Sequence, residues 1–278
     1  MIGASFAHMA RGTTAPPIFD LATDNLSMWL RSEGITGDLT TLVWNGTASA
    51  GTSATHALDH YPGFGDEVTV EPLAIDGKTA VVFPGAGLSP RLTSVYPVRD
   101  DILGALDYAG HSYTLAIVLS PESSSAGSAP GGFVDNQNPS IFDGEGQGYF
   151  ALPLLDVGGD PKVGVYHLDA NTVAGGTPPV SWAPGWGSFG LLWVRYDHLT
   201  QTVRLRINGS NVHTGSLVLS LGASGAGGAA GAGTAGGGTF TLGLRIAELA
   251  AWPAQSLSDP QVIERETYFA SRFPSLGL

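Results

Sequence analysis

The sequence predicts an all-β protein, an antiparallel β-sandwich of jelly-roll type with a C-terminal helix and an extended N-terminal arm. Segments in which apolar and polar residues alternate recur at regular spacing between clusters of turn residues, which is typical of sandwich strands. The composition agrees, since 43% of the residues are apolar while 40 glycines and 18 prolines supply turns and loops. The chain has 278 residues, and we favour one large domain because all-β sandwiches run to roughly 200 to 250 residues.

The arm is expected at residues 1–20 and the sandwich domain at residues 21–278. Residues of the arm are small and sparsely charged, and Pro16 and Pro17 interrupt it. The arm is therefore either a disordered tail or a segment that becomes ordered only against a neighbouring subunit.

Turn signals separate the expected strands along the chain. Asp76-Gly77 and Asn208-Gly209 are dipeptides that favour tight two-residue hairpin turns. A short helix is expected at 99–109, and the stretch at 222–238 is nearly all glycine and alanine, which predicts a low-complexity loop. Strands are expected at residues 26–31, 42–44, 73–75, 79–83, 113–119, 148–155, 163–168, 189–198, 202–207, 217–221 and 239–252.

The last forty residues are the segment around which the rest of the chain is expected to fold. In the expected strand 239–252, the even positions from 240 to 246 are apolar, so one face of the strand is buried. A helix is expected at 259–273, with Ser258 or Asp259 as N-cap and Gln261 placed to complete a capping box. Val262, Ile263, Phe269, Ala270 and Phe273 form its apolar side, and Pro274 ends it.

These segments resemble a known fold family. The strand "TLGLRIAELAAW" with the helix "DPQVIERETYFASRF" resembles the closing segment of concanavalin A-like (laminin G-like) lectin-fold domains. "LSMWLRSEGI" resembles the opening strand of that family, and "LLWVRYDHLTQTVRLRINGSNVHTG" resembles its central hairpin. The resemblance frames residues 26–273 and implies the sandwich, but this fold carries sugar binding, protein binding, hydrolysis and structural roles alike.

Charge and composition exclude several classes of partner. The net charge of −12, with Lys78 and Lys162 as the two lysines, argues against nucleic acid or an anionic membrane as partner. The absence of cysteine excludes disulfides and thiolate metal sites. Residues 1–15 lack the pattern of a secretion signal, and the chain has no apolar run of about 18 residues, so we expect synthesis in the cytoplasm.

Glu248 is the one candidate for acid chemistry. On an even position of strand 239–252 it would be partly buried if the strand has no bulge, and desolvation raises the pKa of a buried carboxyl group, as in catalytic acids. The alternative is a structural ion pair or hydrogen bond, for example with Arg195. The glucanase members of the fold use a Glu-x-Asp-x-x-Glu strand that this sequence lacks, and a lone acid cannot perform the two-carboxylate mechanism. We therefore expect no enzymatic activity and no catalytic residue.

Oxygen ligands are densest in the segment at 135–147. Asp135, Asp143 and Glu145 are candidate calcium ligands, since calcium takes six to eight oxygens. The segment does not match an EF-hand loop, because Leu154 occupies the position where a bidentate glutamate is required. We therefore favour a polar surface loop and expect no cofactor. His56 and His60 have the spacing of a helical zinc pair, but their surroundings favour no helix.

Aromatic residues in expected loops are the candidates for binding. They either stack on sugar rings or anchor a protein partner, or they merely cap the core. The candidates are Trp182, Trp186, Tyr61, Phe64 and Phe142.

Three functions follow from these patterns. The arm, the glycine tract and the single laminin G-like domain resemble, in domain style, accessory virion proteins of tailed bacteriophages, such as head decoration or tail-associated subunits. That resemblance implies a non-enzymatic protein located in the virion, with other virion proteins and further copies of itself (a homo-oligomer) as partners. The alternative is a lectin-like module that binds a glycan, for example on a host surface. A glycoside hydrolase is the least favoured.

Overall fold

Antiparallel β-sheet makes up almost all of the regular structure in the computed structural model. The structure describes residues 18–26, 28–36, 42–47, 55–60, 69–83, 87–88, 91–94, 112–122, 131–135, 148–157, 160–169, 172–217, 229–233, 239–240, 244–253 and 255–278. The strands are β1 (Met28–Thr36), β2 (Val43–Thr47), β3 (Thr55–His60), β4 (Thr69–Ile75), β5 (Lys78–Phe83), β6 (Gly87–Leu88), β7 (Arg91–Ser94), β8 (Tyr113–Pro121), β9 (Gly131–Asp135), β10 (Gly148–Val157), β11 (Asp160–Val163), β12 (Tyr166–Asp169), β13 (Thr172–Gly176), β14 (Val180–Ser181), β15 (Gly190–Asp197), β16 (Thr202–Ile207), β17 (Ser210–Ser216), β18 (Ala229–Gly233), β19 (Thr239–Phe240) and β20 (Leu244–Pro253). The helical elements are η1 (Leu21–Thr23), α2 (Asp259–Arg272) and η3 (Pro274–Leu276).

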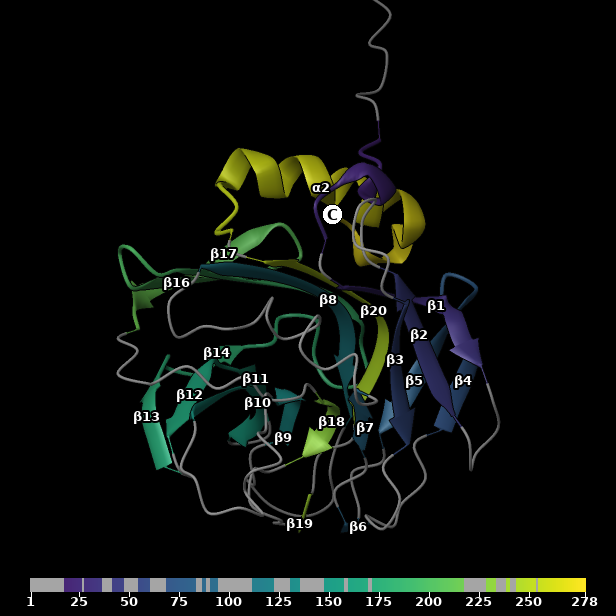
Figure 1. Cartoon of the computed structure of the whole chain (residues 1–278), viewed down its shortest axis with the longest axis horizontal. Helices are drawn as coiled ribbons and strands as arrows, with labels where there is room; N and C mark the ends of the chain where they lie inside the picture. The colour runs from purple at the N-terminus through teal and green to yellow at the C-terminus, as the bar shows by residue number, and fades with distance from the viewer. Residues whose placement is uncertain are drawn as a thin grey trace, which may run out of the picture.

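The strands form two layers, and α2 lies on the outside of one of them (Figure 1). In the upper layer β17, β16, β15, β8 and β20 lie side by side, and β20 then pairs with β5 through its first half and with β1 through its second half. The lower layer contains β9 to β14 and β18. Because β7 pairs with both β18 and β3, the two layers belong to one continuous sheet. The chain is therefore an all-β sandwich, as predicted.

Two apolar cores follow from this layering. Successive residues of a strand point to opposite faces, and β8 is buried along its whole length because both of its faces are covered. The inner core, between the layers, includes Leu115, Ile117, Leu119, Leu192, Val194, Trp44, Val163, Val165 and Trp182. The outer core, between the upper layer and the C-terminal segment, includes Val118, Leu191, Trp193, Trp252, Val262, Phe269 and Phe273 together with Leu21 and Leu26.

A β-bulge in β20 decides which of its residues face each core. Ile246 lies opposite Leu119 and Glu248 lies opposite Val118, so Ala247 is an extra residue in the strand. Leu244 and Ile246 belong to the inner core before the bulge, and Leu249 and Ala251 belong to it afterwards. Glu248 therefore faces the helix, and it does not share a face with the apolar even positions as an unbroken strand would require.

The C-terminal helix begins where the sequence predicts. The Ser258 N–H and Oγ both donate to Gln261 Oε1, each at 2.9 Å, at the start of the helix. The helix ends at Arg272, and Phe273 is its C-cap immediately before Pro274. Ile263, which was expected on the apolar side, is 52% exposed. Within the described part of the chain, no helix is long and apolar enough to cross a membrane.

Several strands differ from the sequence-based expectation. The expected strand 239–252 is divided into β19, which pairs with β6, and β20. The expected strand 163–168 is divided between β11 and β12. Leu217 lies just after the end of β17 at Ser216, and the rest of the strand expected at 217–221 lies outside the described residues. The strand β17 itself was not predicted, because apolar residues mark burial, whereas β17 is an exposed strand held mainly by backbone pairing with β16.

The Gly/Ala-rich tract at 222–238 contains a strand, so the prediction of a loop is wrong for the five residues of β18. β18 pairs with β7 and with β9, and backbone pairing of this kind requires no large side chains. The helix expected at 99–109 lies outside the described residues. So does the expected arm up to residue 17, while the Phe19 N–H donates to Thr267 Oγ1 of α2 at 2.9 Å.

Candidate functional site

The two tryptophans that the sequence analysis predicts as binding residues differ in how deeply they are buried. Both lie in the loop at 182–189, as expected. Trp182 is 2% exposed, its Nε1 donates to the Ser188 carbonyl at 3.2 Å, and a Cβ added to Gly190 would lie 2.6 Å from its ring. We therefore correct the expectation for Trp182, which is a core residue and cannot stack on a sugar. Trp186 is partly buried against the inner core.

The other predicted binding residues are not tested. Tyr61, Phe64, Phe142, Asp143 and Glu145 lie outside the described residues. Asp135 is the last residue of β9, and nothing is described of its side chain.

His56 and His60 lie on β3, a strand, so they cannot form a helical zinc pair. Four residues of strand separate their Cα atoms by about 13 Å, which is too far for a shared ion. Among the described residues no group of three metal-ligating side chains occurs.

Glu248 is held in a structural network beneath α2. Its side chain is fully buried and accepts hydrogen bonds from Trp29 Nε1 and Tyr268 Oη, each at 2.8 Å, and from Arg272 Nε. Burial raises the pKa of Glu248, although Arg272 and the two hydrogen bonds oppose the rise. Arg272 is the partner in place of Arg195, which instead pairs with Asp259 at 2.6 Å.

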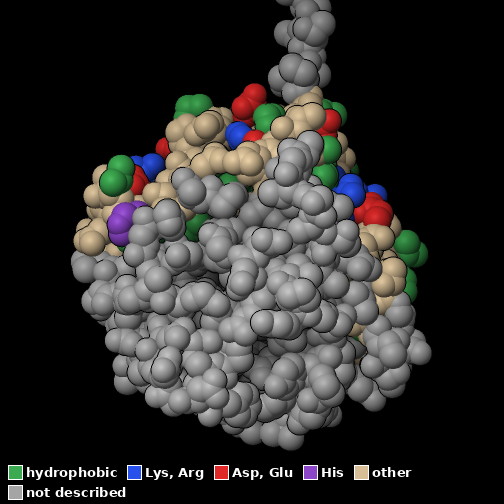
Figure 2. Space-filling model, viewed as in Figure 1, with side chains coloured by type: hydrophobic (Ala, Val, Ile, Leu, Met, Phe, Trp, Pro, Cys, Tyr) green, Lys and Arg blue, Asp and Glu red, His purple; other side chains and the backbone are tan. Residues whose placement is uncertain are grey.

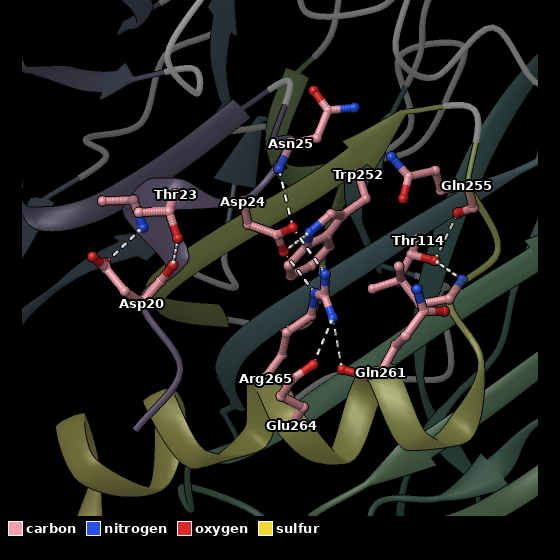
Figure 3. Close-up of polar contacts among 12 residues, drawn as sticks. Asp20, Thr23, Asp24, Asn25, Thr114, Trp252, Gln255, Gln261, Glu264 and Arg265 are labelled. Atoms are coloured by element: carbon pink, nitrogen blue, oxygen red, sulfur yellow. Dashed lines mark hydrogen bonds and ion pairs between the residues drawn. The ribbon is translucent and has the colours of Figure 1, made fainter. Parts of the chain in front are cut away.

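A second network joins the N-terminal segment to the helix (Figure 3). Arg265 donates from Nε and Nη2 to the two oxygens of Asp24 at 2.6 and 2.8 Å, and Trp252 Nε1 donates to Asp24 Oδ2 at 2.6 Å. A bidentate pair of this kind fixes both distance and orientation. Both networks fasten α2 to the upper layer.

A third polar group lies nearer to the surface, at the end of the upper layer next to the loop at 182–189. Arg245 lies on β20 before the bulge, between Val82 of β5 and Ser120 of β8. Its neighbours Leu244 and Ile246 face the inner core, so its side chain faces the other way. We call the following residues the Arg245 cluster: Arg245, Glu71 of β4, Ser120 of β8, Glu122, Gly187 and Phe189.

One guanidinium group holds the Arg245 cluster together. Arg245 donates from Nε to Glu122 Oε1 at 2.6 Å and from Nη1 to Glu71 Oε2 at 3.0 Å. Its Nη2 donates to the Gly187 carbonyl at 2.8 Å and to Ser120 Oγ at 3.2 Å. The Phe189 ring lies under the guanidinium at 4.9 Å, in cation–π contact. Arg245 thereby joins four segments that are far apart in the sequence.

The loop at 182–189 is fixed by its backbone. The Gly185 N–H donates to the Trp182 carbonyl at 3.0 Å, and the Gly187 N–H donates to the Pro121 carbonyl at 2.8 Å. Both glycines have a positive φ, 84° at Gly185 and 68° at Gly187, which favours glycine over other residues. Trp186, which packs partly against the inner core, therefore lies in a segment whose backbone is held on both sides of it.

The charged groups of the cluster differ in their contact with solvent. The side chain of Arg245 is 15% exposed, whereas those of Glu71 and Glu122 are 43% and 33% exposed. Burial alone would lower the pKa of Arg245, but the hydrogen bonds and charges of Glu71 and Glu122 outweigh it and raise that pKa. The guanidinium is thus a fixed support, and the two carboxylates are the groups that a ligand can reach. Figure 2 shows acidic and basic side chains close to one another along the described part of the face that it draws.

Sequence reasoning missed the Arg245 cluster. Each of its residues is unremarkable in its own segment, and only the pairing of β4, β5, β20 and β8 brings them together. The one local signal was the glycine spacing around Trp186, which indicates a tight loop.

Comparisons with known proteins yield a likeness of structure. No family model matches the sequence, and no curated protein matches it. Among solved structures, the binding domain of botulinum neurotoxin serotype D/C VPI 5993 aligns with a TM-score of 0.54 and 10% identity, over 88% of this chain and 53% of that one. A binding domain of botulinum neurotoxin DC in complex with SialylT aligns with a TM-score of 0.55 and 10% identity, over 88% and 52%.

A third structure is described by the statement that cell entry of botulinum neurotoxin type C depends upon interaction with two ganglioside molecules. It aligns with a TM-score of 0.52 and 11% identity, over 85% of this chain and 52% of that one. The chain spans about half the length of these structures. At such low identity the likeness concerns the fold alone, and it agrees with the architecture described above: the chain has a β-sandwich fold similar to that of these binding domains.

Proposed function

We propose that the chain is a lectin-like glycan-binding module and that it binds sugar at the Arg245 cluster and Trp186. The observation that carries the proposal is that one guanidinium fixes two partly exposed carboxylates and also binds the carbonyl of Gly187, next to the partly buried Trp186 in the loop at 182–189. Sugars have an apolar face that packs on aromatic rings and hydroxyl groups that need hydrogen-bond partners. Glu71 and Glu122 of the cluster would accept hydrogen bonds from the hydroxyl groups, and the ring of Trp186 would pack on the apolar face.

The comparisons support this proposal at the level of the fold. The similar domains are described with SialylT bound or as dependent on gangliosides. Fold likeness does not carry a function by itself, and the alignments cover only about half of those domains. The proposal therefore depends on this chain's own residues.

A glycan array tests the proposal. We expect the wild-type chain to bind a subset of glycans and Trp186→Ala to lose at least about fivefold in affinity, since aromatic contacts with ligands contribute on the order of 1 to 3 kcal/mol. Trp186→Phe, which keeps a ring, should retain part of the binding. Because Trp186 is partly buried, thermal denaturation must show that both variants are folded.

Leu199→Ala is the matched control for this experiment. Leu199 is 92% exposed and follows β15, at the opposite end of that strand from the loop at 182–189. The control should bind like wild type. Equal loss in the control and in Trp186→Ala, or no glycan bound by the folded wild type, would refute the proposed function.

The virion role suggested by the domain style stays a separate proposal. It requires association with phage particles, with other virion proteins or with further copies of the chain. Detection of the chain in purified particles would support that role, and its absence from them would count against it.

A further inference from the structure

The Arg245 cluster carries a net negative charge. It contains one cation, Arg245, and two anions, Glu71 and Glu122, so the formal sum is −1. Strand β11, which reaches the start of the loop at 182–189 through its pairing with β14, adds one residue of each sign, Asp160 and Lys162. The formal charge of the whole chain is −12, so the long-range field has the same sign as the cluster.

The cation of the cluster is already committed to internal contacts. Arg245 makes four hydrogen bonds, to Glu122, Glu71, Ser120 and Gly187, and a guanidinium has five N–H groups. An anionic ligand would have to displace a carboxylate from Arg245 or approach Glu71 and Glu122 directly. Both routes are unfavourable, because the first exposes an unpaired carboxylate and the second brings like charges together.

The two carboxylates suit a ligand that donates hydrogen bonds. A carboxylate has about four acceptor positions, and the described contacts of Glu71 and Glu122 with Arg245 and Ser120 use only some of them. Hydroxyl groups of a neutral sugar can donate to the remaining positions. Such bonds to an ionised acceptor are stronger than those between neutral groups.

Resting on the proposed function, we infer that the site selects neutral glycans and discriminates against acidic glycans, such as those that end in sialic acid or carry sulfate. A ligand anion about 6 Å from the net charge of −1 loses a factor of roughly 3 in affinity in a water-like medium, and up to roughly 100 where the effective dielectric constant is about 20. The discrimination depends on charge, so it should weaken as salt shortens the screening length from about 30 Å at 0.01 M to about 8 Å at 0.15 M.

The experiment compares matched pairs of glycans that differ only in the acidic group, for example lactose and sialyllactose, on an array and by titration. We expect wild type to bind the neutral member at least about threefold more tightly at 0.01 M salt, with a smaller ratio at 0.15 M. Glu71→Gln combined with Glu122→Gln changes the formal charge of the cluster from −1 to +1 while keeping the shape of both side chains. In this variant the affinity ratio should shift at least threefold toward the acidic member.

Glu264→Gln serves as the control, because Glu264 lies on α2 outside the Arg245 cluster and its side chain is 61% exposed. It should leave the ratio unchanged, and thermal denaturation must show that the double variant is folded; if it is not, Glu71→Gln alone should give a shift of the same sign. Preference of wild type for the acidic member, or a ratio that the cluster variants do not change, would overturn the inference while leaving glycan binding intact. Absence of binding to every pair would overturn the proposed function and the inference together.

Discussion

Leu73 is an apolar residue whose backbone has the left-handed conformation that favours glycine. It is 74% exposed, its φ is +58°, and it lies where the pairing of β4 with β5 is irregular between Glu71 and Ile75. A left-handed conformation costs a residue with a Cβ roughly 1 kcal/mol, and glycine adopts it freely. We therefore expect Leu73→Gly to raise the free energy of unfolding by about 1 kcal/mol, as measured by urea denaturation.

Leu73→Ala separates backbone strain from side-chain contacts. Alanine keeps the Cβ and therefore the strain, and little buried surface is lost at so exposed a position. Its stability should stay within about 0.5 kcal/mol of wild type. If the alanine variant were as stable as the glycine variant, the strain argument would fail.

Glu248 shows how strongly burial changes the effect of one charge. Glu248→Gln keeps an acceptor for Trp29 and Tyr268, but it places an amide against Arg272 and leaves that guanidinium without its buried partner. Breaking a buried ion pair costs about 3 to 5 kcal/mol. We expect a loss of that size in the free energy of unfolding, measured by chemical denaturation at pH 7.

Glu33→Gln is the matched change at the other end of the same guanidinium. Glu33 also pairs with Arg272, but its side chain is 51% exposed. Ion pairs with an exposed partner contribute about 0 to 1 kcal/mol, so this variant should lose much less stability than Glu248→Gln. Equal losses would show that burial does not decide the contribution of these pairs.

The helix and the hairpins were predictable because their signals are local. Ser258, Gln261 and Pro274 mark the ends of α2 within a few residues of sequence, and Asp76-Gly77 adopts the positive φ angles that its turn signal implies. The sequence indicates the bulge of β20 less clearly than it indicates the helix and the hairpins. Apolar residues at 244 and 246 followed by 249 and 251 change parity, which a regular strand cannot do.

Contacts between distant elements could not be predicted from the sequence. The Arg245 cluster joins residues 71, 120–122, 187–189 and 245, and no local pattern relates these positions. The burial of Trp182 could not be predicted from the sequence either, because its segment has the composition of an exposed loop. In the structure the ring is buried and packs closely against the backbone of Gly190. Pairing partners of distant strands, rather than propensity, therefore determine where the candidate site lies.

At the scale of the molecule, the centre of the upper layer is covered on both faces, and both α2 and the segment from residue 18 are fastened to it. The inner core holds the two layers together, and the outer core with the Asp24 and Glu248 networks holds α2 and the N-terminal segment. Charged groups in these networks contribute to the stability of the whole sandwich. Its stability should consequently depend on pH through the carboxylates that bind Arg272.

The contribution of Glu33 to that dependence has a definite sign. Burial opposes the shift, but the hydrogen bond and the charge of Arg272 prevail and lower the pKa of Glu33 from 4.5 to about 2. A carboxylate with a lowered pKa in the folded state stabilises the protein above its unfolded pKa, and this contribution disappears as the pH falls through the folded pKa. The contribution of Glu33 is thus present above pH 4.5 and lost between pH 4.5 and about 2.

The difference in unfolding free energy between wild type and Glu33→Gln isolates this contribution. Glu248, whose pKa burial raises, responds to pH in the opposite sense, but it is present in both proteins and largely cancels in the difference. We expect wild type to be the more stable protein above pH 4.5 and the two curves to converge as the pH approaches 2, when urea denaturation is measured at several pH values. Solvent screening limits the size of the effect, so it should also shrink at high salt. A difference that stays constant across this pH range would show that the ion pair between Glu33 and Arg272 does not stabilise the fold.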